Sequence, residues 1–162
     1  MRTILIPTDY HISALDCIPN LCMQSENEEL SFIFIHVFKL SDSINELLLL
    51  SRRSREFEQI SDEFYERCET LKASYPQIKR FKMDFLYGNT LNMFKNFLED
   101  NEVDGVLSFS NCSVSKINKS SIDPQVLIQK SGLPVINVSQ IVVSQKIKTF
   151  PAAAKEEMLL EA

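Results

Sequence analysis

Residues 3–9 read TILIPTD. The first four are β-branched residues or leucine and Pro7 ends the run, which is typical of a short buried strand in a parallel sheet. Directly afterwards, apolar side chains at helical spacing share one face of residues 14–22. Ser13 is the predicted N-cap of this helix, with Asp16 at the third helical position of a capping box. The chain is therefore predicted to begin with a buried strand and an amphipathic helix.

The same alternation of strand and helix continues along the chain. The residues from Ser43 to about Tyr75 carry apolar side chains at helical spacing, which predicts one long helix with SRRS, residues 51–54, as the candidate place for an irregularity. Asn89 or Thr90 is the predicted cap of a helix through Leu98, and a last helix is opened by Ser121 or Asp123, reaches Lys130 and ends at Gly132. Further strands are predicted at residues 31–38, 78–88, 103–109 and 133–139.

Five strands separated by four helices predict an α/β fold: an open five-stranded parallel sheet in three layers, with helices on both faces. The third strand, residues 78–88, alternates apolar and charged side chains, so it is expected near a sheet edge. No shift of composition divides the chain, and one domain is expected over residues 1–139. In the tail, residues 140–162, IVV is a candidate extra strand, followed by a helical or disordered segment.

Composition excludes several classes of function. The chain has 17 basic and 22 acidic residues, a net charge of -5, and no long basic block, so nucleic acid is not an expected partner. No apolar run approaches the length of a membrane helix or of a signal peptide's apolar region. Four cysteines without a CxxC pair and two histidines predict no metal site. These features favour a cytoplasmic protein.

The loop after the fourth predicted strand has an unusual composition. Residues 108–121 read SFSNCSVSKINKSS, with six serines and no glycine. In open α/β sheets this strand-to-helix crossing is a usual place for ligands, and a phosphate cradle there is built best from glycines. The hydroxyls and Lys116 could bind an anion or be phosphorylated, or simply form a solvated loop and a helix cap. No G-x-S-x-G elbow is present, so hydrolytic catalysis is not expected.

Several short motifs together resemble universal stress proteins. Their order along the chain matches that family from residue 1 to about residue 139. The motifs are MRTILIPTDY at 1–10, IFIHVF at 33–38, YGNT at 87–90, VDGVLSFS at 103–110 and GLPVINV at 132–138.

The resemblance implies a Rossmann-like fold of the adenine nucleotide alpha hydrolase kind and a homodimer formed through the fifth strands. Many members bind ATP, with the phosphates on a loop of the form G-x2-G-x9-G-[ST]. Phe109 and Cys112 stand in place of the first two glycines here, and Ser120 in place of the third. The candidate nucleotide-binding residues are Pro7, Thr8, Asp9, Val37, Ser110, Asn111, Ser120 and Ser121; the candidate dimer-interface residues are Pro134, Val135, Ile136, Asn137 and Val138.

Two functions follow as hypotheses. The first is a non-catalytic stress-response or regulatory dimer without tight ATP binding, using no metal or other cofactor. The alternative is a sensor that binds ATP, AMP or a small anion weakly through a modified Ser-rich loop. A third hypothesis is that an unknown protein partner binds to the long helix or to the tail. Asp9 is either a ligand contact or a cap of its own turn, and His36 is expected to be a neutral, hydrogen-bonded histidine.

Overall fold

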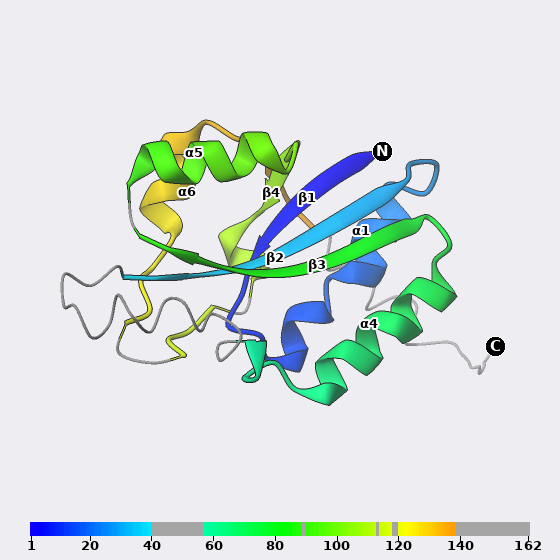
Figure 1. The fold of residues 1–162 in the computed structure, drawn as a ribbon. Helices are drawn as coiled ribbons and strands as arrows, with labels where there is room; N and C mark the ends of the chain where they lie inside the picture. Colours follow the sequence, from blue (N-terminus) through cyan, green and yellow to red (C-terminus); the bar gives the residue numbers. More distant parts are fainter. Residues whose placement is uncertain (40–56, 89, 113, 118–119, 139–162) are drawn as a thin grey trace.

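A five-stranded sheet runs through the centre of the molecule (Figure 1). The computed structural model describes residues 1–39, 57–88, 90–112, 114–117 and 120–138. All four strand pairings are parallel and the order is β3-β2-β1-β4-β5, which confirms the predicted parallel sheet and the edge position of the third strand. The strands are β1 (Arg2–Pro7), β2 (Leu30–Phe38), β3 (Ile78–Tyr87), β4 (Gly105–Leu107) and β5 (Val135–Ile136).

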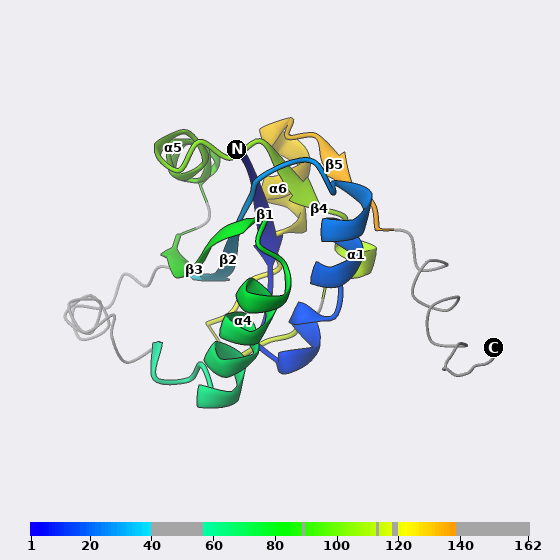
Figure 2. The same ribbon diagram turned by 90° about the vertical axis from the view of Figure 1, so that its right-hand side faces the viewer.

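Helices cover both faces of the sheet, as the sequence predicts (Figure 2). The helices α1 (Ile18–Gln24) and α4 (Asp62–Ser74) pack on one face, and α5 (Leu91–Asp100) and α6 (Gln125–Ser131) pack on the other. Two 3-10 turns, η1 (Ile12–Leu15) and η3 (Phe109–Asn111), follow β1 and β4. The carboxyl ends of β1 and β4 are where the direction of strand order reverses, the usual position of a ligand site in such folds.

The two central strands are buried on both sides. Ile4 and Ile6 of β1 face α1 and α4, whereas Leu5 faces α5 and α6. All nine residues of β2 are buried. Burial of this kind explains why these segments read as continuous apolar runs rather than as alternating strands.

The first helix differs from the prediction. One helix from Ser13 is wrong, because the chain forms η1 and then a separate α1 with Pro19 in its first turn. Proline lacks a backbone N–H and its ring clashes with the preceding turn, so it starts a helix rather than continuing one. Neither η1 nor α1 has a side-chain N-cap, so the capping box predicted at Ser13 and Asp16 is also wrong.

The predicted long second helix is wrong in its first described part. Residues 58–60 form turns, and α4 begins only at Asp62. Ser61 caps it, because its Oγ accepts a hydrogen bond of 3.1 Å from the backbone N–H of Phe64. A serine at this position satisfies an otherwise unpaired N–H and so defines a helix start. Residues 43–56 of the prediction lie outside the described residues.

The later helix ends agree with the sequence in most details. Thr90 caps α5 through a hydrogen bond from the N–H of Met93. The N-cap of α6 is Pro124 rather than Ser121 or Asp123, although the Asp123 carboxylate accepts from the N–H of Gln125. Gly132 ends that helix in the left-handed region with φ 77°. The strands β4 and β5 are shorter than predicted. The predicted tail strand and helix at 140–162 lie outside the described residues.

Candidate functional site

The turn after β1 is held by its own side chains. Thr8 Oγ1 accepts from the N–H of Tyr10 at 2.9 Å, and Asp9 Oδ1 accepts from the N–H of His11 at 3.0 Å. These bonds hold Tyr10 in the left-handed region, φ 63°, which few bulky residues adopt. Asp9 therefore caps its own turn, one of the two roles the sequence left open for it.

Tyr10 ties this turn to the sheet. Its buried hydroxyl accepts from the N–H of Asp84 at 2.9 Å and lies 2.9 Å from the carbonyl oxygen of Phe34 and 2.7 Å from that of Asp84. The phenol thus bridges β2 and β3 at the level of the turn. Burial raises the pKa of Tyr10 well above its ordinary value.

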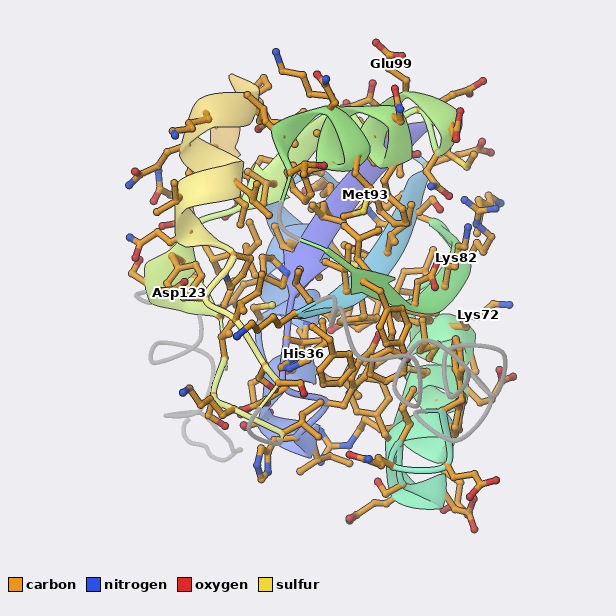
Figure 3. The ribbon with its side chains drawn as sticks, turned by 60° about the vertical axis from the view of Figure 1, so that its left-hand side comes forward. His36, Lys72, Lys82, Met93, Glu99 and Asp123 are labelled. Carbon is orange, nitrogen blue, oxygen red and sulfur yellow. The ribbon has the colours of Figure 1, made fainter. Side chains whose placement is uncertain are left out.

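His36 lies inside the molecule near the end of β2, whereas Lys72 and Glu99 point outward (Figure 3). The Nδ1 atom of His36 lies 2.7 Å from the carbonyl oxygen of Thr8, and the Nε2 atom of His36 lies 2.7 Å from Ser121 Oγ. A carbonyl oxygen only accepts, so Nδ1 carries the proton, and Nε2 accepts from the Ser121 hydroxyl. Burial lowers the pKa of His36, although its bond to Thr8 and the charge of Asp9 act in the opposite direction. The histidine is neutral and hydrogen-bonded, as the sequence suggests.

Residues 120–122 pair with the end of β2 on the side where β1 lies, beyond the last paired residue of β1. Ser121 forms an antiparallel bridge with Phe38. The N–H of Ile122 donates to the carbonyl of Val37 at 3.0 Å, and the N–H of Lys39 donates to the carbonyl of Ser120 at 2.6 Å. We call residues 114–117 together with 120–122 the strap.

The first piece of the strap is tied to the same two strand ends. The Ser115 hydroxyl donates to Asp9 Oδ2 at 2.7 Å, and the N–H of Ile117 donates to Ser121 Oγ at 2.9 Å. Ser121 is only 5% exposed, and its oxygen serves both Ile117 and His36. The strap therefore rests on groups that belong to the carboxyl ends of β1 and β2.

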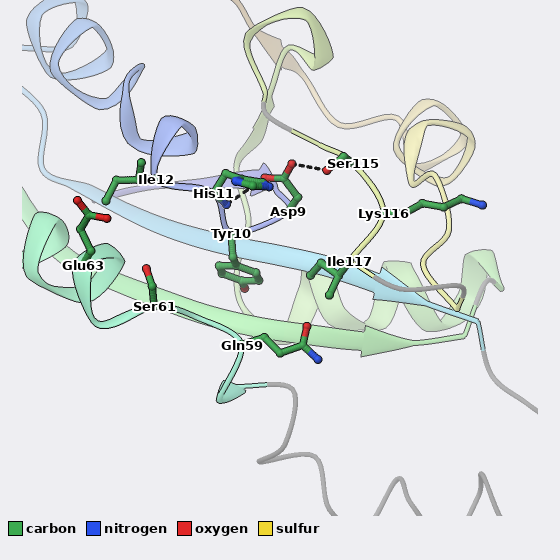
Figure 4. A pocket seen from close by; sticks show the side chains of 10 residues that line it. All are labelled: Asp9, Tyr10, His11, Ile12, Gln59, Ser61, Glu63, Ser115, Lys116 and Ile117. Atoms are coloured by element: carbon green, nitrogen blue, oxygen red, sulfur yellow. Dashed lines mark hydrogen bonds between the residues drawn. The ribbon is translucent and has the colours of Figure 1, made fainter.

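A pocket of about 430 Å³ opens beside this arrangement (Figure 4). The carboxylate of Asp9 and the hydroxyl of Ser115 lie side by side at the pocket, joined by their hydrogen bond, and the Lys116 side chain extends away from Asp9. Its walls come from the β1 turn, the start of α4 and the strap: Asp9, Tyr10, His11, Ile12, Gln59, Ser61, Glu63, Ser115, Lys116 and Ile117. The charged groups of these walls are the carboxylates of Asp9 and Glu63 and the ammonium of Lys116, so Lys116 alone among them attracts a phosphate group.

The predicted nucleotide-binding residues divide into two groups. The first group lies where the ends of β1 and β2 meet the strap. It consists of Pro7, Thr8, Asp9 and Val37 at the strand ends and of Ser120 and Ser121 in the strap. The others lie on η3, where Asn111 Oδ1 accepts from the N–H of Val138 at 3.2 Å and Ser110 lies 3.0 Å from the hydroxyl of Ser108. Asn111 thus holds the end of β5 rather than lining the pocket.

Cys112 is a packed residue of η3's C-terminal end. Its thiol donates to the carbonyl of Ser108 at 3.3 Å. Burial raises its pKa to about 12, so the thiol is protonated and weakly nucleophilic at neutral pH.

The described residues contain no group of three His, Cys, Asp or Glu side chains able to hold a metal ion. None of the helices in the described ranges is long and apolar enough to cross a membrane.

The candidate dimer strand lies at the edge of the sheet opposite β3. Val135 is 57% exposed, whereas Ile136 and Val138 belong to the core and are 8% and 7% exposed. Gln24 Nε2 donates to the carbonyl of Asn137 at 2.9 Å. The side chains that face solvent on this strand are therefore those of Pro134, Val135 and Asn137.

Sequence reasoning missed several parts of the site. Gln59 and Glu63 were expected within a continuous helix, and the pairing of His36 with Ser121 spans 85 residues. His36 within the apolar motif IFIHVF was the available signal, because a buried histidine needs hydrogen-bond partners for both ring nitrogens.

Comparison with known proteins concerns the fold. No family model matches the sequence, and no curated protein matches it. The structure of universal stress protein UspA from Lactobacillus plantarum is similar, with a TM-score of 0.53, 13% identity, and coverage of 85% of this chain and 97% of that chain. The chain has the universal stress protein fold. A hypothetical protein, PH0823, matches that fold with a TM-score of 0.50 and 19% identity, over 85% of this chain and 94% of that chain. At these identities the universal stress protein fold is what the comparison establishes.

Proposed function

We propose that the protein is a cytoplasmic, universal-stress-like regulator that acts as a homodimer, performs no catalysis and binds ATP weakly or not at all. The fold supports the universal-stress-like part of the proposal. The hydrogen bonds already made at the ends of β1 and β2 support the weak binding of ATP. The proposed role is regulation by association with another protein.

One observation carries the proposal: the strap already occupies the groups that the family resemblance assigns to a nucleotide. The carbonyl of Val37 accepts from Ile122, and the hydroxyl of Ser121 is shared between His36 and Ile117. The carboxylate of Asp9 accepts from His11 and Ser115. A nucleotide could use these groups only after displacing the bonds, and a polar group left unpaired costs about 1–3 kcal/mol.

The glycine content supports the same conclusion. The chain contains three glycines, at 88, 105 and 132, and none lies in residues 108–121. Backbone amides surround a phosphate closely only where side chains do not intervene, so serines replace a glycine cradle poorly.

Thermal unfolding with and without Mg-ATP, ADP and AMP tests the weak-binding part. A ligand at about 100 times its Kd stabilises the native state by about 2.7 kcal/mol. We expect no shift of Tm at millimolar nucleotide. A shift that saturates at micromolar nucleotide would refute this part.

The pocket favours a second candidate, a sensor for a small ligand. Its volume of about 430 Å³ suits a small molecule, and Asp9, Ser115 and Lys116 supply polar groups. Saturable binding of AMP or ATP that is lost in Asp9→Ala supports this candidate over the first.

The homodimer is expected to form through β5. An edge strand leaves backbone groups unpaired, and pairing with a second copy satisfies them. Sedimentation of Val135→Glu tests this, with Val126→Glu on α6 as control, since the two valines are 57% and 56% exposed. We expect the wild type and Val126→Glu to be dimers and Val135→Glu to be a monomer. A monomeric wild type at micromolar concentration contradicts the dimer.

A further inference from the structure

We propose that the pocket beside the β1 turn binds a small organic cation, a protonated amine or guanidinium group on a short aliphatic stem. The inference rests on the second candidate function, a sensor for a small ligand, and names the class of that ligand. It replaces the nucleotide considered there by a ligand of opposite charge. The hydrogen-bonding atoms and the charges of the pocket walls carry it.

The side chains of Asp9 and Ser115 form a wall that accepts hydrogen bonds. The Ser115 hydroxyl donates its one hydrogen to Asp9 Oδ2 at 2.7 Å, so Ser115 Oγ offers lone pairs to the pocket. The Asp9 carboxylate, which is 9% exposed, is an acceptor, and each of its oxygens can accept more than one hydrogen bond. A group bound at this wall must therefore donate.

A phosphate group meets the wrong atoms at this wall. Its oxygens are acceptors, so it could bind Ser115 only by taking the hydroxyl hydrogen away from Asp9. It would then lie beside the Asp9 carboxylate as a like charge. An ammonium or guanidinium group instead donates to the carboxylate in a charge-assisted hydrogen bond, which is shorter and stronger than one between neutral groups.

A second carboxylate reaches the pocket from α4. Glu63 lies in the first turn of that helix and lines the pocket on the α4 side, whereas Asp9 lines it on the β1 side (Figure 4). Among the described lining residues Lys116 carries the opposite charge, and its side chain extends away from Asp9. The charges of these walls therefore favour a cation over an anion.

The remaining walls suit a small ligand with an apolar stem. Ile12 and Ile117 contribute aliphatic surface, and Gln59 and His11 can each donate or accept. The volume of about 430 Å³ lies in the lower part of the range of about 300–1,000 Å³ that is usual for small-molecule sites. A cationic head at Asp9 with a short carbon chain along the isoleucines matches the chemistry of these walls.

NMR titration of the full chain, followed amide by amide, tests the site. The probes are n-butylammonium and n-butylguanidinium, and the comparison ligands are AMP, inorganic phosphate and n-butanol, which has the same stem without a charge. We expect the amides of His11, Ile12 and Ser115 to shift saturably with both cations, with a Kd of about 1 mM for ligands of so few atoms. The three comparison ligands should bind at least about tenfold more weakly.

Glu63→Gln and Asp62→Asn are a matched pair of variants. Both remove a carboxylate from the first turn of α4, and of the two residues Glu63 is the one that lines the pocket. We expect Glu63→Gln to weaken binding of both cations at least about threefold and Asp62→Asn to leave their Kd within about twofold. Asp9→Asn keeps an acceptor for the N–H of His11 but removes the charge, so it should also weaken both cations.

The outcomes separate this inference from the proposed functions. Absence of saturable shifts with either cation at about 20 times the expected Kd overturns the inference and leaves the regulator without tight ATP binding in place. Binding of AMP in preference to the cations also overturns it, but supports the second candidate. Equal affinity for n-butanol, or equal weakening in the two α4 variants, overturns it as well, because charge at the pocket would then not select the ligand.

Discussion

Ser121 donates a hydrogen bond of 2.7 Å to Nε2 of His36 across 85 residues of sequence. This contact joins the end of β2 to the loop that follows β4, on the opposite side of β1 in the sheet. The same oxygen accepts from Ile117, so one hydroxyl fixes the strap in two directions. Ser121, which the family resemblance assigns to a nucleotide, thereby binds two other residues of the protein.

Burial of His36 makes stability depend on pH. Burial lowers the pKa of His36 from 6.5 in the folded chain, so below about pH 6.5 the unfolded chain binds the proton more readily. The free energy of unfolding should fall as pH drops through this range, by at most about 1.4 kcal/mol per pH unit for one proton. Urea unfolding at several pH values measures it. The slope should diminish in His36→Asn and persist in His11→Asn, whose histidine is exposed; a persisting slope in His36→Asn contradicts the assignment.

Removing the hydroxyl of Tyr10 should destabilise the fold. Tyr10→Phe leaves the N–H of Asp84 and the carbonyl of Phe34 without this bridging partner, and buried unpaired groups cost about 1–3 kcal/mol. Chemical denaturation measures the change. Tyr65→Phe is the matched control, because that side chain is 39% exposed, and it should change stability by less than about 0.5 kcal/mol. Equal effects of the two substitutions would show that the bridge contributes nothing.

Loss of the cap on α4 should also be measurable. Ser61→Ala removes the acceptor of the Phe64 N–H, and cap removal typically costs about 1 kcal/mol. Ser74→Ala, at the exposed other end of the same helix, should stay within about 0.5 kcal/mol. Equilibrium unfolding of both variants decides. A neutral Ser61→Ala would instead agree with the continuous helix that the sequence predicts.

The cysteines should be unreactive in the folded protein. Burial raises the pKa of Cys17, Cys68 and Cys112 to about 12 and that of Cys22 to about 11. Thiolate is the reactive form, so a disulfide reagent should label native thiols slowly at neutral pH and all four rapidly in urea. Above about pH 9 the unfolded chain ionises first, and stability should fall. Rapid labelling of one native thiol, abolished in Cys112→Ser, would contradict this prediction and would indicate a redox role for that residue.

The sheet was predictable because its signals are local. Apolar runs such as residues 31–38 identify the buried strands, and alternation in residues 78–88 identifies the edge strand β3. Helix starts were less predictable where two signals compete. Pro19 overrides the helical spacing that follows Ser13, and Ser61 overrides the longer periodicity that includes Phe57.

The candidate site was predictable only in part. The turn at Asp9 and the end of β2 meet because parallel strands share their carboxyl edge. The partners of the serines were not predictable, because a hydroxyl in a loop carries no sequence signal for the atom it will bind. Ser121 was expected to face phosphate, yet it binds a histidine on a strand distant in sequence. Asn111 was expected at the same site, yet it holds Val138.

Calorimetric titration of the wild type with Mg-ATP, beside Asp9→Ala, tests most directly the claim that the strap has taken over a nucleotide's contacts. We expect no heat of binding in either protein up to about millimolar ATP, a binding free energy weaker than about -4 kcal/mol. A micromolar Kd in the wild type that is lost in Asp9→Ala would show that the Ser-rich loop binds nucleotide after all, and would contradict the account.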